Sequence, residues 1–235
     1  CAHCACRQLD SPARCHHPEA VAAQVLFSRR YEWHGQGYAI VVRVLSMQRR
    51  CPWCGDDPQY VAYHDQEWGV PVRDDVALFV KLTLDTFQSG LSWLVVLRKS
   101  DAILDAMDEL DPVRLAGWKP ERVDMAVKDA RIIRNRAKIE AAVNNARCFV
   151  QIAERGQSFS QLLWSYVGGK TIRNAWISVD ELPARSSESE AMAKELKTLG
   201  FKWTGPTVCY AFMQAVGMVN DHLTDCFRYE PCNSL

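Results

Sequence analysis

The chain has 235 residues with 28 basic and 28 acidic side chains, so its formal net charge is zero and no global basic field indicates a nucleic-acid partner. No run of about eighteen or more apolar residues occurs, which argues against a membrane span, and the start lacks the order of a secretory signal. Ten cysteines without regular spacing are typical of a reducing compartment, so we expect a cytoplasmic protein without disulfides.

Residues 1–46 differ from the rest of the chain. They carry several cysteines and histidines at irregular spacings and only two short apolar runs, Val21 to Phe27 and Tyr38 to Leu45. A second metal-binding module is one interpretation, but we favour an N-terminal extension of uncertain order, because the sequence from Met47 resembles a natural start. We therefore expect the functional domain to span residues 47–235.

A metal site is indicated by residues from both ends of this domain. His222 and Cys226 are four residues apart, so on a helix both would point from one face. Cys51 and His64 can supply two further ligands of the kinds that tetrahedral zinc prefers. On spacing alone Cys54, two residues beyond Cys51 in a Cys-x-x-Cys pair, competes with His64 for the fourth place.

From Asp74 onward the apolar pattern is almost wholly helical. Helical spacing covers 76–82 and 93–97 and continues after a break towards 102–110, and Pro112 and Pro120 mark turns or helix starts. Further helices are predicted over 121–128, 135–156, 158–166, 188–199 and 207–216, with 183–187 as the main loop. Because alternating strand patterns are nearly absent, the predicted fold class is all-α.

Residues 199–208 place Gly200 and Gly205 around a short turn between two helical patterns. Such a turn exposes backbone N–H groups at the start of the next helix, where they can hold a phosphate. This resembles the hairpin of helix-hairpin-helix DNA-binding proteins. The glycine spacing alone favours an ordinary helical connection with a glycine cap, so the hairpin interpretation depends on the rest of the chain.

Five segments, read in order, resemble one known family. They are Cys51-Pro52-Trp53, Tyr60 to Pro71, Gln88 to Trp93, Cys209 to Ala215 and Asn220-Asp221-His222. Together they are similar to the DNA-3-methyladenine glycosylase I family from Met47 to about Tyr229. The resemblance implies a bacterial base-excision repair enzyme with an all-α, helix-hairpin-helix DNA glycosylase-like fold. It also implies one structural Zn²⁺ that joins the N- and C-terminal segments, with ligands at the positions of Cys51, His64, His222 and Cys226.

A cationic methylated base suits an aromatic pocket, because each ring attracts positive charge by ~0.5 to 2 kcal/mol. The base must be flipped out of the duplex and held on its faces and edges. The candidate substrate-binding aromatics are Trp53, Tyr60, Tyr63, Trp68 and Trp93. Each could instead fill a core, and Trp53 or Trp68 could pack around the metal. The resemblance implies that Tyr63 and Trp93 sandwich or flank the base.

Asp85 is the candidate catalytic and base-binding carboxylate. The family has Glu at this position, one methylene longer. Asp85 shares a helical face with Leu78 and Leu82, so it can be partly buried, where an anion favours a cationic base. Equally, Asp85 followed by Gln88 is close to a capping-box arrangement at a helix start.

The candidate DNA-binding residues are Gln88, Gly90, Leu91 and Gly205. Leu91 can wedge into the base stack, as apolar side chains do in DNA-deforming proteins. The common alternative is that it is a core residue of the next helix. Gly205 belongs to the hairpin that would hold a phosphate.

The resemblance also implies that an essential Asp of related glycosylases is missing here, with Asn220 as its nearest match. Asp221 is then a spare catalytic candidate or a partner that orients His222. No Lys follows the hairpin at Pro206, so no Schiff-base lyase step is expected. The predicted enzyme is a monomer that acts on double-stranded DNA containing 3-methyladenine and leaves an abasic site.

Two alternatives remain open at the level of sequence. A non-catalytic, zinc-stabilised protein that binds DNA damage is supported by the change from Glu to Asp at position 85. A hydrolytic zinc enzyme with Glu67 as its base would need an open coordination position on the metal.

Overall fold

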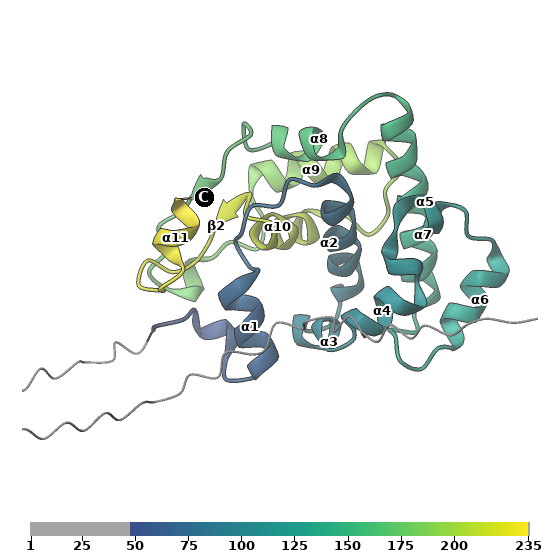
Figure 1. The fold of residues 1–235 in the computed structure, drawn as a ribbon. Coiled ribbons are helices and arrows are strands. Elements are labelled where there is room, and N and C mark those ends of the chain that lie inside the picture. Colours follow the sequence, from purple (N-terminus) through teal and green to yellow (C-terminus); the bar gives the residue numbers. More distant parts are fainter. Residues whose placement is uncertain (1–47, 235) are drawn as a thin grey trace, which may run out of the picture. The chain divides into compact units, whose positions relative to one another are not determined.

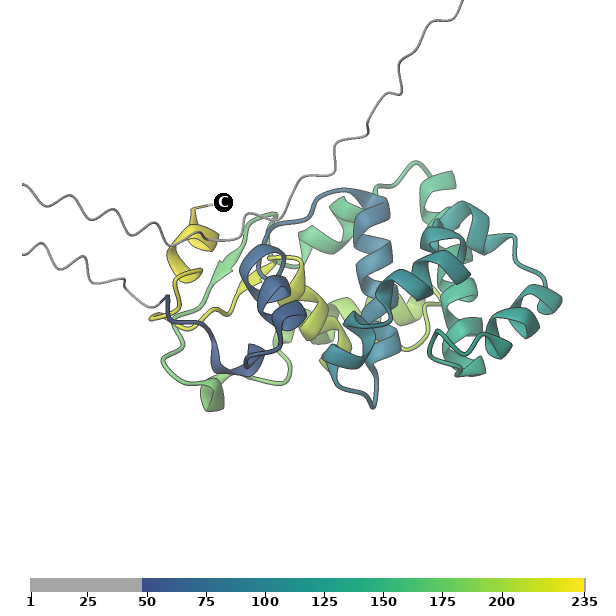
Figure 2. The same ribbon diagram turned by 60° about the horizontal axis from the view of Figure 1, so that its bottom comes forward.

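The computed structural model describes residues 48–234, and these residues form a predominantly helical body (Figures 1 and 2). The helices are α1 (Pro58–Gln66), α2 (Asp75–Gln88), α3 (Trp93–Leu97), α4 (Ser100–Ala106), α5 (Pro112–Ala116), α6 (Pro120–Lys128), α7 (Arg136–Glu154), α8 (Phe159–Ser165), α9 (Ser187–Thr198), α10 (Pro206–Ala215) and α11 (Tyr229–Asn233). Short 3-10 turns occur at η1 (Pro52–Cys54), η2 (Asp108–Leu110) and η3 (Val179–Glu181). The predicted helical fold class is confirmed. The extension proposed for residues 1–46 lies outside the described residues.

Side-chain caps and prolines define where the helices begin. Asp74 accepts a hydrogen bond from the Ala77 backbone N at 2.8 Å and caps α2, and Ser158 caps α8 through the backbone N of Gln161. A proline that needs no amide hydrogen bond opens α1, α5, α6 and α10. The helix α1 was not predicted, although Asp57 followed by Pro58 is a helix-start signal of the same kind.

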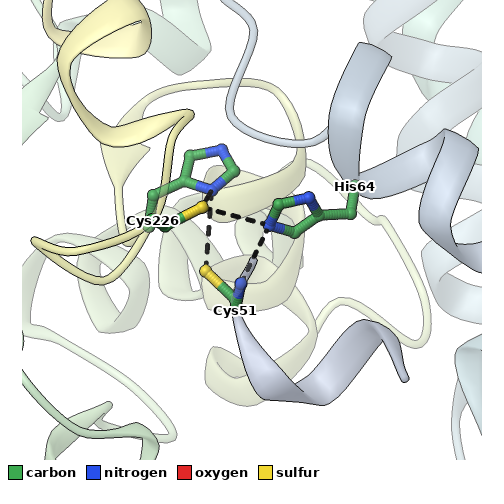
Figure 3. A group of neighbouring side chains, drawn as sticks. Cys51, His64 and Cys226 are labelled. Carbon is green, nitrogen blue, oxygen red and sulfur yellow. Dashed lines mark hydrogen bonds between the residues drawn. The ribbon is translucent and has the colours of Figure 1, made fainter. Parts of the chain in front are cut away.

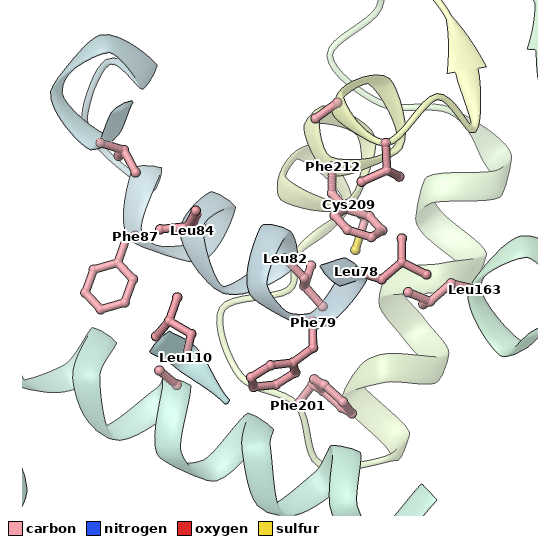
Figure 4. Close-up of a cluster of buried hydrophobic side chains, with 14 of the residues drawn as sticks. Leu78, Phe79, Leu82, Leu84, Phe87, Leu110, Leu163, Phe201, Cys209 and Phe212 are labelled. Atoms are coloured by element: carbon pink, nitrogen blue, oxygen red, sulfur yellow. The ribbon is translucent and has the colours of Figure 1, made fainter. Parts of the chain in front are cut away.

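Helix α2 is the centre of the core and contacts α3, α7, α8 and α10. Figure 4 shows Leu78, Phe79 and Leu82 of α2 lying towards side chains from neighbouring elements. Those neighbours include Phe201 before α10 and Cys209 and Phe212 within it. Because α2 is almost fully buried over residues 82–87, a charged side chain in that stretch is held away from water.

Two short strands bring distant segments together. β1 (Ile172–Arg173) and β2 (Val219–Asn220) pair in parallel, with Ile172 opposite Val219. Gly217 precedes β2 with φ +69°, and a Cβ there would lie 2.6 Å from the Pro71 backbone N, so only glycine fits. This close approach fixes the path of the chain into the segment that carries His222.

Residues His222–Cys226 are not helical, so that prediction was wrong. They form the loop between β2 and α11, at the same end of the body as α1 (Figures 1 and 2). Within residues 48–234, no helix is long and apolar enough to cross a membrane.

Candidate functional site

The four predicted metal ligands come together in one buried cluster. The ligand atoms of Cys51, His64, His222 and Cys226 all lie within 4.8 Å of one another, and each side chain is at most 4% exposed. Figure 3 shows Cys51, His64 and Cys226 pointing towards a common centre. Sulfur and imidazole nitrogen lie 3.5 Å apart for Cys226 and His64, 3.6 Å for Cys226 and His222, and 3.7 Å for Cys51 and His222.

The remaining nitrogen of each imidazole has its own partner. His64 Nδ1 lies 2.8 Å from Asp65 Oδ1, and that carboxylate accepts hydrogen bonds from the Arg50 guanidinium. His222 Nε2 lies 3.1 Å from the backbone O of Trp68. Such partners orient metal-binding imidazoles and leave the inner nitrogen free as a ligand. The donor set and its surroundings therefore fit a bound metal ion.

Local backbone features place these ligands. His64 lies in the last turn of α1, and Cys51 directly precedes η1. In the loop after β2, the Asn220 side chain accepts from the backbone N of His222 and donates to the backbone O of Tyr229. The Asn220 side chain is thus a structural clamp for the loop, a role the sequence did not reveal.

Cys54 is not a member of the cluster. Its thiol donates to the backbone O of Cys51 at 3.2 Å, a local bond inside the η1 turn. Of the two thiols in the cluster, Cys226 differs from Cys54: hydrogen bonds from the Cys51 thiol and, to a smaller extent, with the two imidazoles lower the pKa of Cys226. These hydrogen bonds favour the thiolate form of Cys226, the form that binds metals.

Next to the cluster is a cavity of about 260 Å³. All five predicted aromatic residues line it, together with Asp85 and Gln88; the full lining is Trp53, Tyr60, Tyr63, Trp68, Asp85, Gln88, Trp93, Val179, Leu182, Ala211, Gln214 and Ala215. The contributions of η3 and α10 were not predicted. In the sequence, the apolar pattern gives the η3 segment no regular structure and indicates only a core helix for α10.

The aromatic rings form two contacting groups. Trp53 is at the centre of one, with ring centroids 5.2 Å from Tyr60 and 4.9 Å from Trp68. Tyr63 and Trp93 form the other, 5.2 Å apart, and an edge contact between Tyr63 and Trp53 at 6.5 Å joins the two groups. Trp68 also packs edge-on against the His222 imidazole at 4.6 Å. The two interpretations of these aromatics, cavity wall and packing around the metal site, are therefore both realised.

Asp85 lies inside α2, so the interpretation as a helix cap was wrong. The residue as a whole is 3% exposed, and Oδ1 accepts a hydrogen bond from the ammonium of Lys81, one turn earlier, at 2.5 Å. Burial raises the pKa of Asp85 and lowers the pKa of Lys81, and the opposite charge of the partner counteracts both shifts. Lys81 was missed by sequence reasoning, although its i, i+4 spacing to Asp85 was visible.

Three polar atoms around the cavity have no hydrogen-bond partner among the described residues. They are Oδ2 of Asp85 and the indole Nε1 groups of Trp53 and Trp93. Unpaired buried polar atoms are costly, so three of them around one cavity indicate that a bound molecule, such as a ligand or water, supplies their partners. The cavity therefore offers one acceptor and two donors to a flat, polar-edged molecule.

The predicted DNA-binding residues fall in two places. Gln88 ends α2 and lines the cavity, Gly90 follows with φ +77°, and Leu91 at the tip of this turn is 40% exposed. Leu91 is therefore not a core residue. Gly205 caps α10 and lines a different hollow, of about 740 Å³, beside Lys194, Lys197, Lys202 and Trp203.

Helix α7 holds both of these turns through buried polar side chains that sequence reasoning missed. Lys138 is 3% exposed, and its ammonium donates to the backbone O of Phe87 at 2.8 Å and of Ser89 at 2.5 Å. Asn145 makes two hydrogen bonds with the backbone of Lys202 in the turn before α10. The signal was a Lys and an Asn seven residues apart on an apolar helical stripe.

The Asp221 carboxylate makes no hydrogen bond to the His222 imidazole, so its predicted role as the partner that orients His222 was wrong. It is 1% exposed and accepts hydrogen bonds from four side chains, those of Asn174, Trp176, Tyr210 and Gln214, each at 2.7 to 2.8 Å. With its oxygens already engaged, Asp221 ties the segment after β1 to α10.

Comparisons with known proteins agree with this fold and site. The family model for methyladenine glycosylases matches residues 53–229. DNA-3-methyladenine glycosylase 1 of Escherichia coli is 43% identical over 180 residues, which are 77% of this chain and 96% of that protein. DNA-3-methyladenine glycosylase of Haemophilus influenzae is 40% identical over 188 residues, 80% of this chain and 100% of that protein.

Solved structures give the same result. A crystal structure of 3-methyladenine DNA glycosylase I has a TM-score of 0.75 and 44% identity, and the match covers 76% of this chain and 98% of that one. The Staphylococcus aureus glycosylase I, solved to explain 3-methyladenine recognition, has a TM-score of 0.74 and 34% identity, covering 77% and 96%.

The helical fold, with an aromatic cavity that contains one buried carboxylate, defines the class of protein as an N-glycosylase, an enzyme that releases a base from its sugar. Within this class, the chain belongs to the methyladenine glycosylase family.

Proposed function

We propose that this enzyme excises 3-methyladenine from alkylated double-stranded DNA and leaves an abasic site. The observation that carries the proposal is the cavity, in which five aromatic side chains surround a buried carboxylate. It is supported by relatives named DNA-3-methyladenine glycosylase and by a related structure in complex with 3-methyladenine. We assign this activity to residues 47–235 and treat residues 1–46 as an extension of it.

The reaction needs little acid catalysis. When the bond from C1′ of the sugar to N9 of the base breaks, its electron pair stays on the base and cancels the positive charge that N3-methylation created. A water molecule then adds to C1′ and loses a proton. The protein can therefore accelerate the reaction mainly by extracting the base from the stack and holding it in the geometry of bond cleavage.

The side chains of the cavity can hold the base in this way. Tyr63 and Trp93 would face the flat surfaces of the base, with Trp53, Tyr60 and Trp68 forming the rest of the wall. The unpartnered Oδ2 of Asp85 can accept a hydrogen bond from the base edge, and the indole N–H groups of Trp53 and Trp93 can donate. Asp85 is thus our candidate catalytic residue.

The DNA would be contacted by two turns. Leu91, exposed at the tip of the turn with Gln88 and Gly90, would enter the gap left by the flipped base. Gly205, at the start of α10, would present backbone N–H groups to a phosphate in the manner of a helix-hairpin-helix motif. One chain supplies the cavity and both turns, so a monomer is expected to suffice.

The enzyme is expected to be monofunctional. Pro206 and Thr207 follow the turn, where a lyase would need a lysine amine to form a Schiff base with the sugar. Lys138 cannot serve instead, because its ammonium is buried against the backbone O atoms of Phe87 and Ser89.

The metal cluster fits one structural Zn²⁺. For tetrahedral Zn²⁺ with Zn–S of about 2.3 Å and Zn–N of about 2.0 to 2.1 Å, sulfur and nitrogen should lie about 3.6 Å apart. The distances from Cys226 to His64 and to His222, 3.5 Å and 3.6 Å, agree with this value. The ion would fasten the start of the domain to its end. Four protein ligands leave no open position, which disfavours a hydrolytic zinc enzyme.

The alternative is a damage-binding protein that does not release the base. One experiment separates the two: incubate a methylated duplex oligonucleotide with the protein, then measure its electrophoretic retardation, its abasic sites and its strand breaks. We expect abasic sites without strand breaks until alkali is added. Retardation without abasic sites would support the damage-binding protein, and strand breaks without alkali would contradict a monofunctional enzyme.

A further inference from the structure

Asp85, which lines the base cavity, forms a buried ion pair with Lys81, which does not line it. They lie one turn apart on α2, and their Nζ and Oδ1 atoms are 2.5 Å apart. The Asp85 side chain is 2% exposed and the Lys81 side chain 17%. Because water is nearly excluded, the charge of Asp85 is balanced mainly by Lys81 rather than by solvent.

The same ammonium lies against the aromatic wall. Lys81 Nζ is 3.9 Å from the centroid of the Trp93 ring and 5.9 Å from that of Tyr63. These are cation–π distances, and the two rings are those that would face a flipped base. The groups best suited to attract a cation from the substrate therefore already hold one from the protein.

This arrangement changes what the cavity can select. An unpaired carboxylate beside two electron-rich rings would favour a cationic base over a neutral one. With Lys81 in place, the ion pair has no net charge, so repulsion by the ammonium opposes the attraction of the Asp85 carboxylate for a cationic base; the Glu67 carboxylate also acts on Lys81, from the end of α1. The unpartnered Oδ2 of Asp85 and the two indole N–H groups still offer hydrogen bonds, which a neutral base can use equally well.

We infer that Lys81 is a specificity-determining residue. Its ammonium lies beside both Asp85 and the Trp93 ring, where the positive charge of a cationic base would otherwise be stabilised. The cavity therefore binds neutral N-alkylated purines nearly as well as cationic ones. This inference rests on the proposed function, because it assumes that the cavity holds the base. It extends the expected ligands of the cavity from cationic bases to uncharged N-alkylated purines.

The test compares two small ligands by quenching of tryptophan fluorescence at pH 8. One is 3,9-dimethyladeninium, a permanent cation that mimics the base as it is attached to sugar, and the other is neutral 3-methyladenine. We expect Lys81→Met to shift the ratio of the two affinities about tenfold in favour of the cation, relative to the ratio of the wild-type protein. Because each ratio is compared between variants, the effect of the extra methyl group cancels.

Three variants control the interpretation. Lys128→Met removes one exposed lysine from α6, away from the cavity lining, and should keep the wild-type ratio. Lys81→Gln removes the charge but keeps a polar side chain, and it replaces Lys81→Met if thermal unfolding shows that Met does not fold. Adding Asp85→Asn to Lys81→Met should abolish the gain, because the carboxylate is what the cation would contact.

The possible outcomes separate this inference from the proposed function. An unchanged ratio in both folded Lys81 variants, compared with the wild-type ratio, would overturn the inference alone. If the folded wild-type protein and both variants bind neither ligand, the purine cavity itself is wrong, and the proposed function falls with it.

Discussion

The chemistry of the cavity depends on a few residues, and Asp85 is the central one. Its carboxylate is the only charged group that lines the cavity within the described part of the chain. Burial raises its pKa, and Lys81 opposes that shift. The charge state of Asp85 is therefore set by burial and by Lys81. The sequence pattern of α2 indicates the burial, because Asp85 shares a helical face with Leu78 and Leu82, but it does not indicate the pairing with Lys81.

The pH dependence of base release should reveal this carboxylate. Because burial raises the pKa of Asp85, the charged form is lost as pH falls through a value above the ordinary ~3.9 of an aspartate. We expect kcat/KM of the wild-type enzyme to fall on the acid side at such a pH. Asp85→Asn should lower kcat/KM by roughly 10- to 100-fold, as for a lost charge-assisted hydrogen bond, and should remove that acid limb. An acid limb that persists in Asp85→Asn would assign it to another group.

The stability of the ion pair gives a second prediction at the residue scale. Lys81→Met alone leaves the Asp85 carboxylate buried without a partner and should destabilise the protein by about 3 to 5 kcal/mol in urea unfolding. Lys81→Met combined with Asp85→Leu should recover most of this loss, because an apolar pair in the same space costs no desolvation. If the double variant has the same free energy of unfolding as Lys81→Met, the ion pair itself stabilises the fold, which would contradict this prediction.

At the scale of elements, α7 links the two turns that are proposed to contact DNA. Lys138 holds the backbone at the end of α2, and Asn145 holds the turn before α10. One helix thus holds both the turn at residues 88–91, which carries Leu91, and the turn before α10, which carries Gly205. Neither Lys138 nor Asn145 touches the cavity.

Lys138→Met tests this link. The variant leaves the Phe87 and Ser89 backbone O atoms without their donor, which should cost about 1 to 3 kcal/mol of stability. Amide hydrogen exchange should become faster over residues 88–91 and stay unchanged in the metal loop. Lys128→Met, which removes a surface lysine, is the matched control. Unchanged exchange over residues 88–91 would show that the turn holds its shape without Lys138.

The metal cluster joins α1 to the loop after β2, and its removal should be visible in thermal unfolding. We expect Cys226→Ser to lose bound zinc and about 3 kcal/mol of stability, which lowers Tm by roughly 6 to 12 °C for a domain of this size. Cys54→Ser, a buried cysteine outside the cluster, should keep one zinc per chain by mass spectrometry. Equal zinc loss in both variants would contradict the ligand assignment.

At the scale of the whole molecule, the helices were predictable because apolar residues recur at helical spacing where a helix buries one face. The predicted helix over 135–156 corresponds to α7, Arg136–Glu154, and that over 207–216 to α10, Pro206–Ala215. The strands β1 and β2 were not predictable, because two residues each carry no alternation. The metal ligands were predicted as a set, and the structure brings all four together.

What sequence reasoning could not provide is how distant segments meet. The helical spacing of His222 and Cys226 suggested a helix, whereas a loop held by Asn220 places them. Val179 and Leu182 complete the cavity from a segment that has no distinctive pattern. The pairing of Lys81 with Asp85 required knowing that both face the buried side of α2 rather than solvent.

The central claim is that this cavity releases 3-methyladenine, and chromatography of the bases freed from methylated duplex DNA tests it most directly. The purified protein, shown to be folded and to contain zinc, should release 3-methyladenine, and Asp85→Asn at equal zinc content should release much less. No free base from the folded, zinc-loaded wild-type protein would contradict the claim.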